Sequence, residues 1–315
     1  MGERKKFISI VTACYNEEGN IAQLYLSIKD IFKNLPAYDY EHVFIDNDSK
    51  DRSRQILREI ASKDQNVKVI FNTRNFGHIR SPLHAIYQAK GDAIISIVAD
   101  FQDPPEMIPA FLEKWEEGNK IVIGIKKKSQ EGFLMFSLRK AFYSILNKFS
   151  DIELVKNFTG FGLYDRSFIE IVKEINDPYP YFRGLIPEFG MQRFEIEYVQ
   201  PKRHRGTSNQ SFITLYDIAM LGFVNYSKIP LRMASFVGFS IAILSFLIAL
   251  GYLIYKLLFW QEFNLGLAPL VIGLFFFSSV QLIFIGIIGE YVGSILTQIQ
   301  HTKRPLVIEK ERLNF

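Results

Sequence analysis

The sequence predicts an α/β fold with a mostly parallel sheet, followed by two long apolar helices. Between Phe7 and Ile125, short apolar runs alternate with amphipathic segments. This alternation is typical of parallel strands joined by right-handed crossover helices. Polar clusters follow the apolar runs repeatedly. Two long runs without charge, Met233–Tyr255 and Phe263–Gly289, come later in the chain. These three observations define the expected architecture.

The strands of the sheet are predicted from short runs rich in Ile, Val and Phe. Such runs are long enough for a buried strand and too short for a helix. In chain order they are Phe7–Ala13, His42–Ile45, Val67–Phe71, the run that begins at Ile94, and Ile121–Ile125. We therefore expect a parallel sheet whose strands are buried on both faces.

Helices are predicted between these strands. The first begins at a cap, Asn20, and runs to about Asn34,. The helix after the third strand is expected to stop at Gly91, since glycine is common just after a helix. The helix after the fourth strand is expected to follow Asp103 as its cap, with Glu106 closing a capping box.

Polar side chains gather where the first four strands end. The clusters are Tyr15–Glu18, Asp46–Asp51, Arg74–Gly77 and Asp100–Asp103. Because the carboxyl ends of parallel strands share one edge of a sheet, we expect the clusters to form one crevice. A nucleotide is the natural ligand of such a crevice. The chain has neither a GxGxxG motif after the first strand nor a GxxxxGK[ST] motif, which excludes the dinucleotide fingerprint and the P-loop,.

Asp100 and Gln102 are the candidate metal ligands. Hard cations such as Mg²⁺ bind a few carboxylate or amide oxygens together with substrate phosphates. Both residues directly follow the fourth strand, where a ligand would bind,. The alternative is that they only end a strand and begin a helix.

The two uncharged runs predict membrane-spanning helices. The chain of 315 residues is 48% hydrophobic and 15% aromatic, which is high for a purely soluble protein. At about 1.5 Å per residue, each run is long enough to cross a hydrocarbon core of about 30 Å. Basic residues flank the outer ends of the runs, at Lys228, Arg232, Lys303 and Arg304. The positive-inside rule therefore places both termini in the cytoplasm. Two buried core helices are the alternative.

Charge and cysteine content exclude other classes. A net charge of +4 is too small to indicate nucleic acid as a partner, and we expect none,. The single cysteine, Cys14, excludes an intramolecular disulfide and fits a reducing compartment,. Because Cys14 lies in an apolar strand, it is expected to be a buried small side chain.

Three further segments are amphipathic or basic. Leu138–Phe149 and Phe212–Tyr226 have helical spacing of apolar residues, so each could lie in a membrane interface or be an ordinary surface helix. The basic loop Lys202–Arg205 could bind a diphosphate through its forked guanidinium groups, or it could be a solvated run of charge,.

These motifs resemble those of family-two glycosyltransferases of the GT-A fold. The resemblance is strongest to the membrane-anchored polyprenyl-phosphate glycosyltransferases, the bactoprenol glucosyltransferase and dolichol-phosphate mannose synthase type. It covers nearly the whole chain. The segments that carry it are Ile10–Glu18, the acids Asp46 and Asp51 of a DDGSTD-like turn, Arg74–Gly77, Ala99–Glu106 with the sequence ADFQDPPE, and Arg203–Ser208.

The resemblance implies a role for particular residues. Those implied to bind the nucleotide are Ala13, Tyr15, Asn16, Glu17, Asp46, Asn75, Gly77, Ala99, Asp100, Arg203 and Arg205. Asp100, Gln102 and Arg203 are implied to act in catalysis, with Mg²⁺ or Mn²⁺ held by Asp100 and Gln102. Our candidates for the acceptor phosphate are Lys126, Arg139 and Tyr143.

The chain departs from the family pattern at three positions. Val98 stands where the usual DxD motif has its first acid, Gly160 where many relatives have an acid, and Asn209 where a lysine is frequent. Asp100, either alone or together with Gln102, must then hold the metal. The missing acid at Gly160 is compatible with a phosphate acceptor, because such a nucleophile has no proton that must be removed.

The resemblance implies inverting transfer of a sugar from a nucleotide sugar, with uridine the first expectation for the base, to polyprenyl (undecaprenyl) phosphate. The expected domains are a cytoplasmic GT-A catalytic domain (1–210), a juxtamembrane amphipathic helix (211–230), a two-helix transmembrane domain (231–298) and a cytoplasmic C-terminal tail (299–315). The chain would be a multi-pass protein of the cytoplasmic membrane and a homo-oligomer such as a tetramer. Two alternatives stay open: a catalytically degenerate membrane-bound nucleotide-sugar-binding subunit, and a nucleotidyltransferase that releases pyrophosphate.

Overall fold

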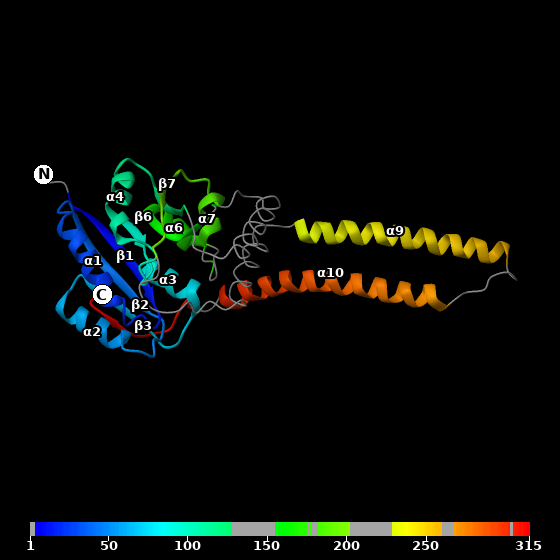
Figure 1. Cartoon of the computed structure of the whole chain (residues 1–315), viewed down its shortest axis with the longest axis horizontal. Helices are drawn as coiled ribbons and strands as arrows, with labels where there is room; N and C mark the ends of the chain where they lie inside the picture. The colour runs from blue at the N-terminus through cyan, green and yellow to red at the C-terminus, as the bar shows by residue number, and fades with distance from the viewer. Residues whose placement is uncertain are drawn as a thin grey trace.

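The computed structural model describes residues 4–127, 155, 157–175, 177, 182–201, 229–259, 267–302 and 305–315. Within these residues, a mixed sheet is covered by helices on both faces, and two long helices extend away from this α/β domain (Figure 1). The predicted α/β class is confirmed.

The described residues form an eight-stranded sheet in the order β7-β5-β6-β4-β1-β2-β3-β8. Pairing is parallel for β1–β2, β1–β4, β2–β3 and β5–β7, and antiparallel for β4–β6, β5–β6 and β3–β8. The strands are β1 (Lys6–Cys14), β2 (Tyr38–Asp46), β3 (Val67–Asn72), β4 (Ala93–Ser96), β5 (Ile121–Lys126), β6 (Phe158–Asp165), β7 (Arg193–Tyr198) and β8 (Glu309–Leu313).

Helices cover both faces of the sheet. They are α1 (Ile21–Lys33), α2 (Ser53–Lys63), α3 (Gly77–Gln88), the 3-10 helix η1 (Pro105–Met107), α4 (Ile108–Glu116), α6 (Arg166–Ile175), α7 (Phe182–Glu188), α9 (Ile229–Leu258) and α10 (Leu267–Thr302). One face packs against α3, α6 and α7, and the other against α1, α2 and α4. Side chains of β1 alternate between the two faces, so both faces are apolar and need a covering layer of helices. Ile8 and Ile10 pack with α1 and α4, whereas Val11 packs on the opposite face,.

All five predicted strands are confirmed, but some local interpretations are wrong. The helix α3 ends at Gln88, before Gly91. A Cβ at Gly91 would lie 2.5 Å from the backbone nitrogen of Ser9, so this glycine permits close approach to β1 and does not terminate a helix. Asn20 precedes α1 but makes no capping hydrogen bond, since its side-chain amide donates to Glu17 Oε2 at 2.6 Å.

The long helices α9 and α10 contain the two uncharged runs over most of their length and lie side by side (Figure 1). Among the described residues, one segment, Phe276–Leu296 in α10, is long and apolar enough to cross a membrane. In α9 the apolar stretch Ser235–Ile248 is shorter. Two membrane-spanning helices therefore remain a prediction, with α10 the better supported.

Strands β6, β7 and β8 are not among the predicted strands. The last of them, β8, comes from residues expected to form a cytoplasmic tail, and it extends the sheet beyond β3. The candidate amphipathic segments Leu138–Phe149 and Phe212–Tyr226 lie outside the described residues.

Burial of a histidine in β2 makes the stability of the fold depend on pH. His42 is 1% exposed, and its Nε2 lies 3.0 Å from the hydroxyl of Thr12. Burial lowers the pKa of His42 to about 3 from 6.5. The folded state therefore holds this imidazole neutral, whereas the unfolded chain protonates it below about pH 6.5.

Lowering the pH should therefore destabilise the protein through His42. The contribution of neutral His42 to the free energy of unfolding is fully present above the pKa that this residue has in the unfolded chain. It is lost as the pH falls below that value. Between pH 6.5 and pH 5 the expected loss is about 1.5 kcal/mol. Denaturant unfolding at the two pH values measures it. His42→Gln should abolish this part of the pH dependence, and an unchanged dependence in that variant would contradict the assignment.

Candidate functional site

The loops that follow β1 and β2 are joined by hydrogen bonds. The backbone N–H of Asn16 donates to Ser49 Oγ at 2.9 Å, and that of Glu17 donates to Ser53 Oγ at 2.9 Å. In return, Asn16 Oδ1 accepts from the backbone N–H of Lys50 at 2.8 Å. Two polar clusters distant in sequence therefore meet at one edge of the sheet, as the strand polarity predicts.

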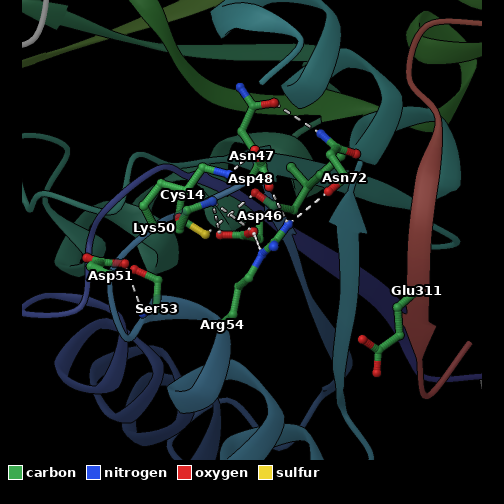
Figure 2. A network of polar contacts seen from close by, with 12 residues as sticks. Cys14, Asp46, Asn47, Asp48, Lys50, Asp51, Ser53, Arg54, Asn72 and Glu311 are labelled. Carbon is green, nitrogen blue, oxygen red and sulfur yellow. Dashed lines mark hydrogen bonds and ion pairs between the residues drawn. The ribbon is translucent and has the colours of Figure 1, made fainter. Parts of the chain in front are cut away.

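Asp46, at the end of β2, is fully buried and holds the turn that follows it (Figure 2). Arg54 Nε donates to Asp46 Oδ2 at 2.7 Å, and the backbone N–H of Ser49 lies 3.2 Å from the same oxygen. The Arg54 guanidinium also pairs with Asp48 at 3.0 Å and donates to the carbonyl of Asn72 at 2.9 Å. These contacts explain the position of Asp46 without a ligand. Its contact with a nucleotide base stays a prediction.

Asn47 joins the loop after β2 to the loop after β3. Its Nδ2 donates to Asn75 Oδ1 at 2.9 Å and to the carbonyl of Gly77 at 3.1 Å. Its Oδ1 accepts from the backbone N–H of Phe76 at 2.9 Å and from Asn72 Nδ2 at 3.1 Å, the latter visible in Figure 2. Both polar atoms of this amide are thus used to position the predicted nucleotide loop. Asn47 was not among the predicted site residues, although it lies inside a predicted polar cluster.

The loop after β3 brings together Asn75 and Gly77, both predicted to bind the nucleotide. Asn75 Oδ1 accepts from the backbone N–H of Gly77 at 2.8 Å. Gly77 has φ +87°, a conformation that other residues rarely adopt,. A sharp turn therefore precedes α3, and its glycine is required by the backbone.

The loop after β4 lies beside the end of β1. The backbone N–H of Ile97 donates to the carbonyl of Val11 at 3.0 Å. Ala99 is 3% exposed and packs in the same apolar cluster as Cys14, which is buried as predicted. Phe101 is buried with φ +62°, a left-handed conformation that reverses the chain between Asp100 and Gln102,.

Asp103 does not cap a helix, contrary to the prediction. The helical turn begins at Pro105 without a side-chain cap. The carboxylate of Asp103 instead accepts from the backbone N–H of Val98 at 3.3 Å and from the hydroxyl of Tyr198 in β7 at 3.2 Å. Burial raises the pKa of Asp103 to about 6, while the charge of Lys126 opposes this shift. Asp103 therefore fixes the loop that carries Asp100.

Asp100 and Gln102, the predicted metal ligands, both lie in the loop after β4, and their role in holding a metal stays a prediction. Asp100 is buried, and its Oδ1 accepts from the backbone N–H of Gln102 at 3.1 Å. Val98, at the position of the missing acid, is 44% exposed. Among the described residues there is no group of three or more His, Cys, Asp or Glu side chains that could hold a metal ion. One carboxylate and one amide suit a hard cation that also binds substrate phosphates.

A family model described as Glycosyl transferase family 2 matches residues 9–172, which include all four polar loops. The chain belongs to glycosyltransferase family 2. Its mostly parallel α/β domain is GT-A-like, as the sequence motifs imply, and the protein is a glycosyltransferase.

Curated relatives of this glycosyltransferase extend over nearly its whole length. The SfII prophage-derived bactoprenol glucosyl transferase of Shigella flexneri is 32% identical over 308 residues, covering 98% of this chain and 99% of that protein. The prophage bactoprenol glucosyl transferase homolog of Escherichia coli K12 is 32% identical over 304 residues, covering 96% and 98%. The uncharacterized glycosyltransferase YkcC of Bacillus subtilis is 34% identical over 301 residues, covering 95% and 92%.

Solved structures are more distant. The glucosyl-3-phosphoglycerate synthase of Mycobacterium tuberculosis, crystallised with Mn²⁺, UDP and phosphoglyceric acid, has a TM-score of 0.47 and 18% identity, covering 70% of this chain and 76% of that one. This similarity is too low to support an inference about the site of the glycosyltransferase.

The remaining predicted residues divide into two groups. Ala13 and Tyr15 lie at the end of β1, with Tyr15 36% exposed, and Lys126 lies at the end of β5, where its charge acts on Asp103. The other predicted residues, Arg139, Tyr143, Arg203 and Arg205, lie outside the described residues. The structure therefore brings together the predicted nucleotide and metal residues of the first four loops.

Gly160 lies in β6 with φ +102°. A side chain at this position would be strained, whatever space is available,. The carbonyl of Gly160 also accepts the hydroxyl of Tyr164 at 2.8 Å. The backbone of this glycosyltransferase thus disfavours an acid at position 160, where the resemblance to the family implies one.

Asn47→Ala should loosen the loop after β3. The variant removes the acceptor for the Phe76 N–H and the donor to the Gly77 carbonyl, so stability should fall by about 1–3 kcal/mol. Hydrogen exchange of the Phe76 amide should accelerate at the same time. Asn119→Ala is the matched control, because it also deletes an amide–backbone bond, to Lys114, but remote from this loop. Equal exchange of Phe76 in the wild type and Asn47→Ala would contradict the bridging role.

Proposed function

We propose that this glycosyltransferase transfers a sugar from a nucleotide-sugar donor, with uridine as the base, to a polyprenyl phosphate such as undecaprenyl phosphate. The reaction inverts the anomeric centre and takes place at the cytoplasmic face of the membrane. The observation that carries the proposal is the set of joined loops at one sheet edge, in a chain whose full-length relatives are named bactoprenol glucosyl transferases.

The joined loops support a nucleotide donor. Backbone and amide groups of Asn16, Asn75 and Gly77 lie at the carboxyl edge of a parallel sheet, where nucleotides bind in open α/β folds,. The residues are small and polar, so they can offer hydrogen bonds to a base and ribose while the sheet keeps their spacing rigid. Arg203 and Arg205 are proposed to contact the donor diphosphate.

The long helices support a lipid acceptor. Large apolar side chains on α9 and α10 are exposed to the surroundings, among them Phe236, Leu247, Leu282 and Ile299. A continuous exposed apolar surface of this kind is expected where lipid replaces water. We propose that both helices span the membrane, so that the polyprenyl tail stays in the bilayer while its phosphate reaches the crevice. Oligomerisation, as a tetramer, is part of the proposal.

The proposed chemistry is a single displacement. An oxygen of the lipid phosphate attacks the anomeric carbon, a bond forms between them, and the bond from this carbon to the diphosphate breaks. The departing nucleoside diphosphate takes the electron pair. A phosphate monoester has its second pKa near about 6, so most of it is dianionic at pH 7 and needs no general base. A glycine at position 160 is consistent with this chemistry.

Stabilising the negative charge on the leaving diphosphate is a greater requirement for this reaction than removing a proton from the acceptor. Asp100, with Gln102, would hold Mg²⁺ or Mn²⁺, which when bound would stabilise the negative charge that develops on the leaving group. Asp103 keeps the Asp100 loop in place through Val98 and Tyr198. Lys126, at the end of β5, is proposed to attract the acceptor phosphate with Arg139 and Tyr143.

A donor screen tests the proposed reaction. Full-length protein in lipid is incubated with single nucleotide sugars and undecaprenyl phosphate, and mass spectrometry identifies the lipid product. The expected product is undecaprenyl phosphate carrying one sugar, with release of nucleoside diphosphate. Release of pyrophosphate would contradict a glycosyl transfer. Tight binding of nucleotide sugars without any lipid product would instead favour a degenerate binding subunit.

Asp100→Asn should lower turnover by about a hundredfold or more, because a neutral amide is a weaker ligand for a hard cation. Chelation of divalent ions should have a similar effect on the wild type. Asp39→Asn is the control. Asp39 is an exposed residue at the start of β2, and its Oδ1 lies 3.8 Å from Nζ of Lys5. Turnover of Asp100→Asn at the wild-type rate, or full activity in chelator, would refute the metal role of this loop.

A further inference from the structure

A C-terminal return segment, residues 305–314, comes back from the long helices to the α/β domain. The helix α10 ends at Thr302, and β8 then pairs antiparallel with β3 from Asn72↔Glu309 to Val69↔Leu313. The return segment therefore reaches β3 at its carboxyl end, where the loop with Asn75 and Gly77 begins. It leaves β3 at the opposite end, far from the candidate site.

The first part of the return segment holds both ends of that loop. Immediately before the loop, the backbone N–H and the hydroxyl of Thr73 each donate to the carbonyl of Ile308 at 3.0 Å. Immediately after it, in the first turn of α3, Arg80 Nη2 donates to the carbonyl of Pro305 at 2.7 Å. Arg80 is itself 7% exposed, so the return segment is bonded here to a guanidinium that the domain holds in place.

Side chains strengthen the same junction. His84, one turn further along α3, lies 2.5 Å from a carboxylate oxygen of Glu309. Val307 is 4% exposed, and Leu306 packs against the apolar cluster beneath α3. Leu306, Val307 and Glu309 thus attach the return segment to the domain on the side of α3 and the loop, while Ile308 is exposed.

The last part of the return segment is anchored elsewhere. Asn314 Nδ2 donates to the carbonyls of Ala61 at 2.7 Å and Val67 at 2.9 Å, at the end of α2 and the start of β3. Glu311 pairs with Arg58 of α2. These contacts stabilise the sheet edge, but they lie at the end of β3 remote from the loop.

We infer that residues 305–309 are a positioning element of the donor site, which ties the loop with Asn75 and Gly77 to the membrane-directed helix α10. The inference rests on the proposed function, in which this loop binds the nucleotide. Thr73 and Arg80 lie on either side of the loop in the sequence, and both bond to the return segment. The loop is therefore restrained by the return segment as well as by Asn47 of the loop after β2. In the sequence, two residues lie between the end of α10 at Thr302 and Pro305 at the junction.

Two point variants of the return segment distinguish positioning of the loop with Asn75 and Gly77 from stabilisation of the sheet edge at β3. Glu309→Ala removes the contact with His84 beside the loop and the hydrogen bonds that Glu309 accepts from Arg312 in β8, and Asn314→Ala removes the remote anchor. Each is compared with the wild type for thermal midpoint, for KM of the nucleotide sugar and for KM of polyprenyl phosphate. Two truncated chains make the same comparison with larger changes. The chain that ends at residue 309 lacks only the remote part of the return segment, and the chain that ends at residue 304 lacks the whole segment.

Loss of the segment beside the loop should weaken donor binding selectively. The chain ending at residue 304 should show a donor KM raised by about tenfold or more, since small misplacements of binding groups are costly, while the acceptor KM changes little. The chain ending at residue 309 and Asn314→Ala should keep the donor KM within about twofold, even where the thermal midpoint falls. Glu309→Ala should raise the donor KM at a thermal midpoint no lower than that of Asn314→Ala.

Equal donor KM values for Glu309→Ala and Asn314→Ala would overturn the inference, because β8 would then only close the sheet edge. If the chain ending at residue 304 does not fold, the two point variants decide alone. A wild-type chain that transfers no sugar from any donor would overturn the proposed function, and the inference with it. Wild-type transfer with unchanged donor KM in Glu309→Ala would overturn the inference and leave the proposed function intact.

Discussion

The parallel pairing of β2, β1 and β4 is the constraint on which the site depends. β1 is paired with β2 along its whole length, from Lys6↔Tyr38 to Cys14↔Asp46, and with β4 on its other side. Both faces of these strands are covered, so a slip of one residue would exchange the side chains that pack on the two faces and would separate the buried polar pairs Ser9–Glu41 and Thr12–His42,. The register therefore fixes where each strand ends, and three polar loops must open on the same edge.

Small polar groups join the loops along this shared edge. Asn16 joins the loops after β1 and β2, Asn47 joins those after β2 and β3, and Asp103 links the loop after β4 to Tyr198 of β7. Asn47 and Asp103 are buried, and buried polar groups are costly to leave unpaired, so each loop restricts its neighbours,. The return segment adds a restraint from outside at Thr73. In the proposed function, this network positions the loops for donor binding and for delivery of the sugar at a membrane surface.

Local sequence patterns predict the first five strands and the convergence of the loops that follow four of them, because both follow from periodicity and strand polarity. They do not predict Glu309–Leu313 as a strand, since EKERL is charged and its partner β3 lies far away in the sequence. Asp103 has the local pattern of a helix cap, but a distant tyrosine and a backbone amide determine its role. Gly91 likewise serves a neighbouring strand. Short motifs report local chemistry, whereas these contacts depend on the tertiary fold.

Calorimetric titration of the full chain with UDP in the presence of Mn²⁺ tests most directly whether the joined loops form one nucleotide site. The account predicts one UDP bound per chain, with affinity lowered about tenfold or more by Asn75→Ala, a loss of about 1.4 kcal/mol or more. Binding to Asn75→Ala at the wild-type affinity would contradict the claim that the loop after β3 belongs to the donor site.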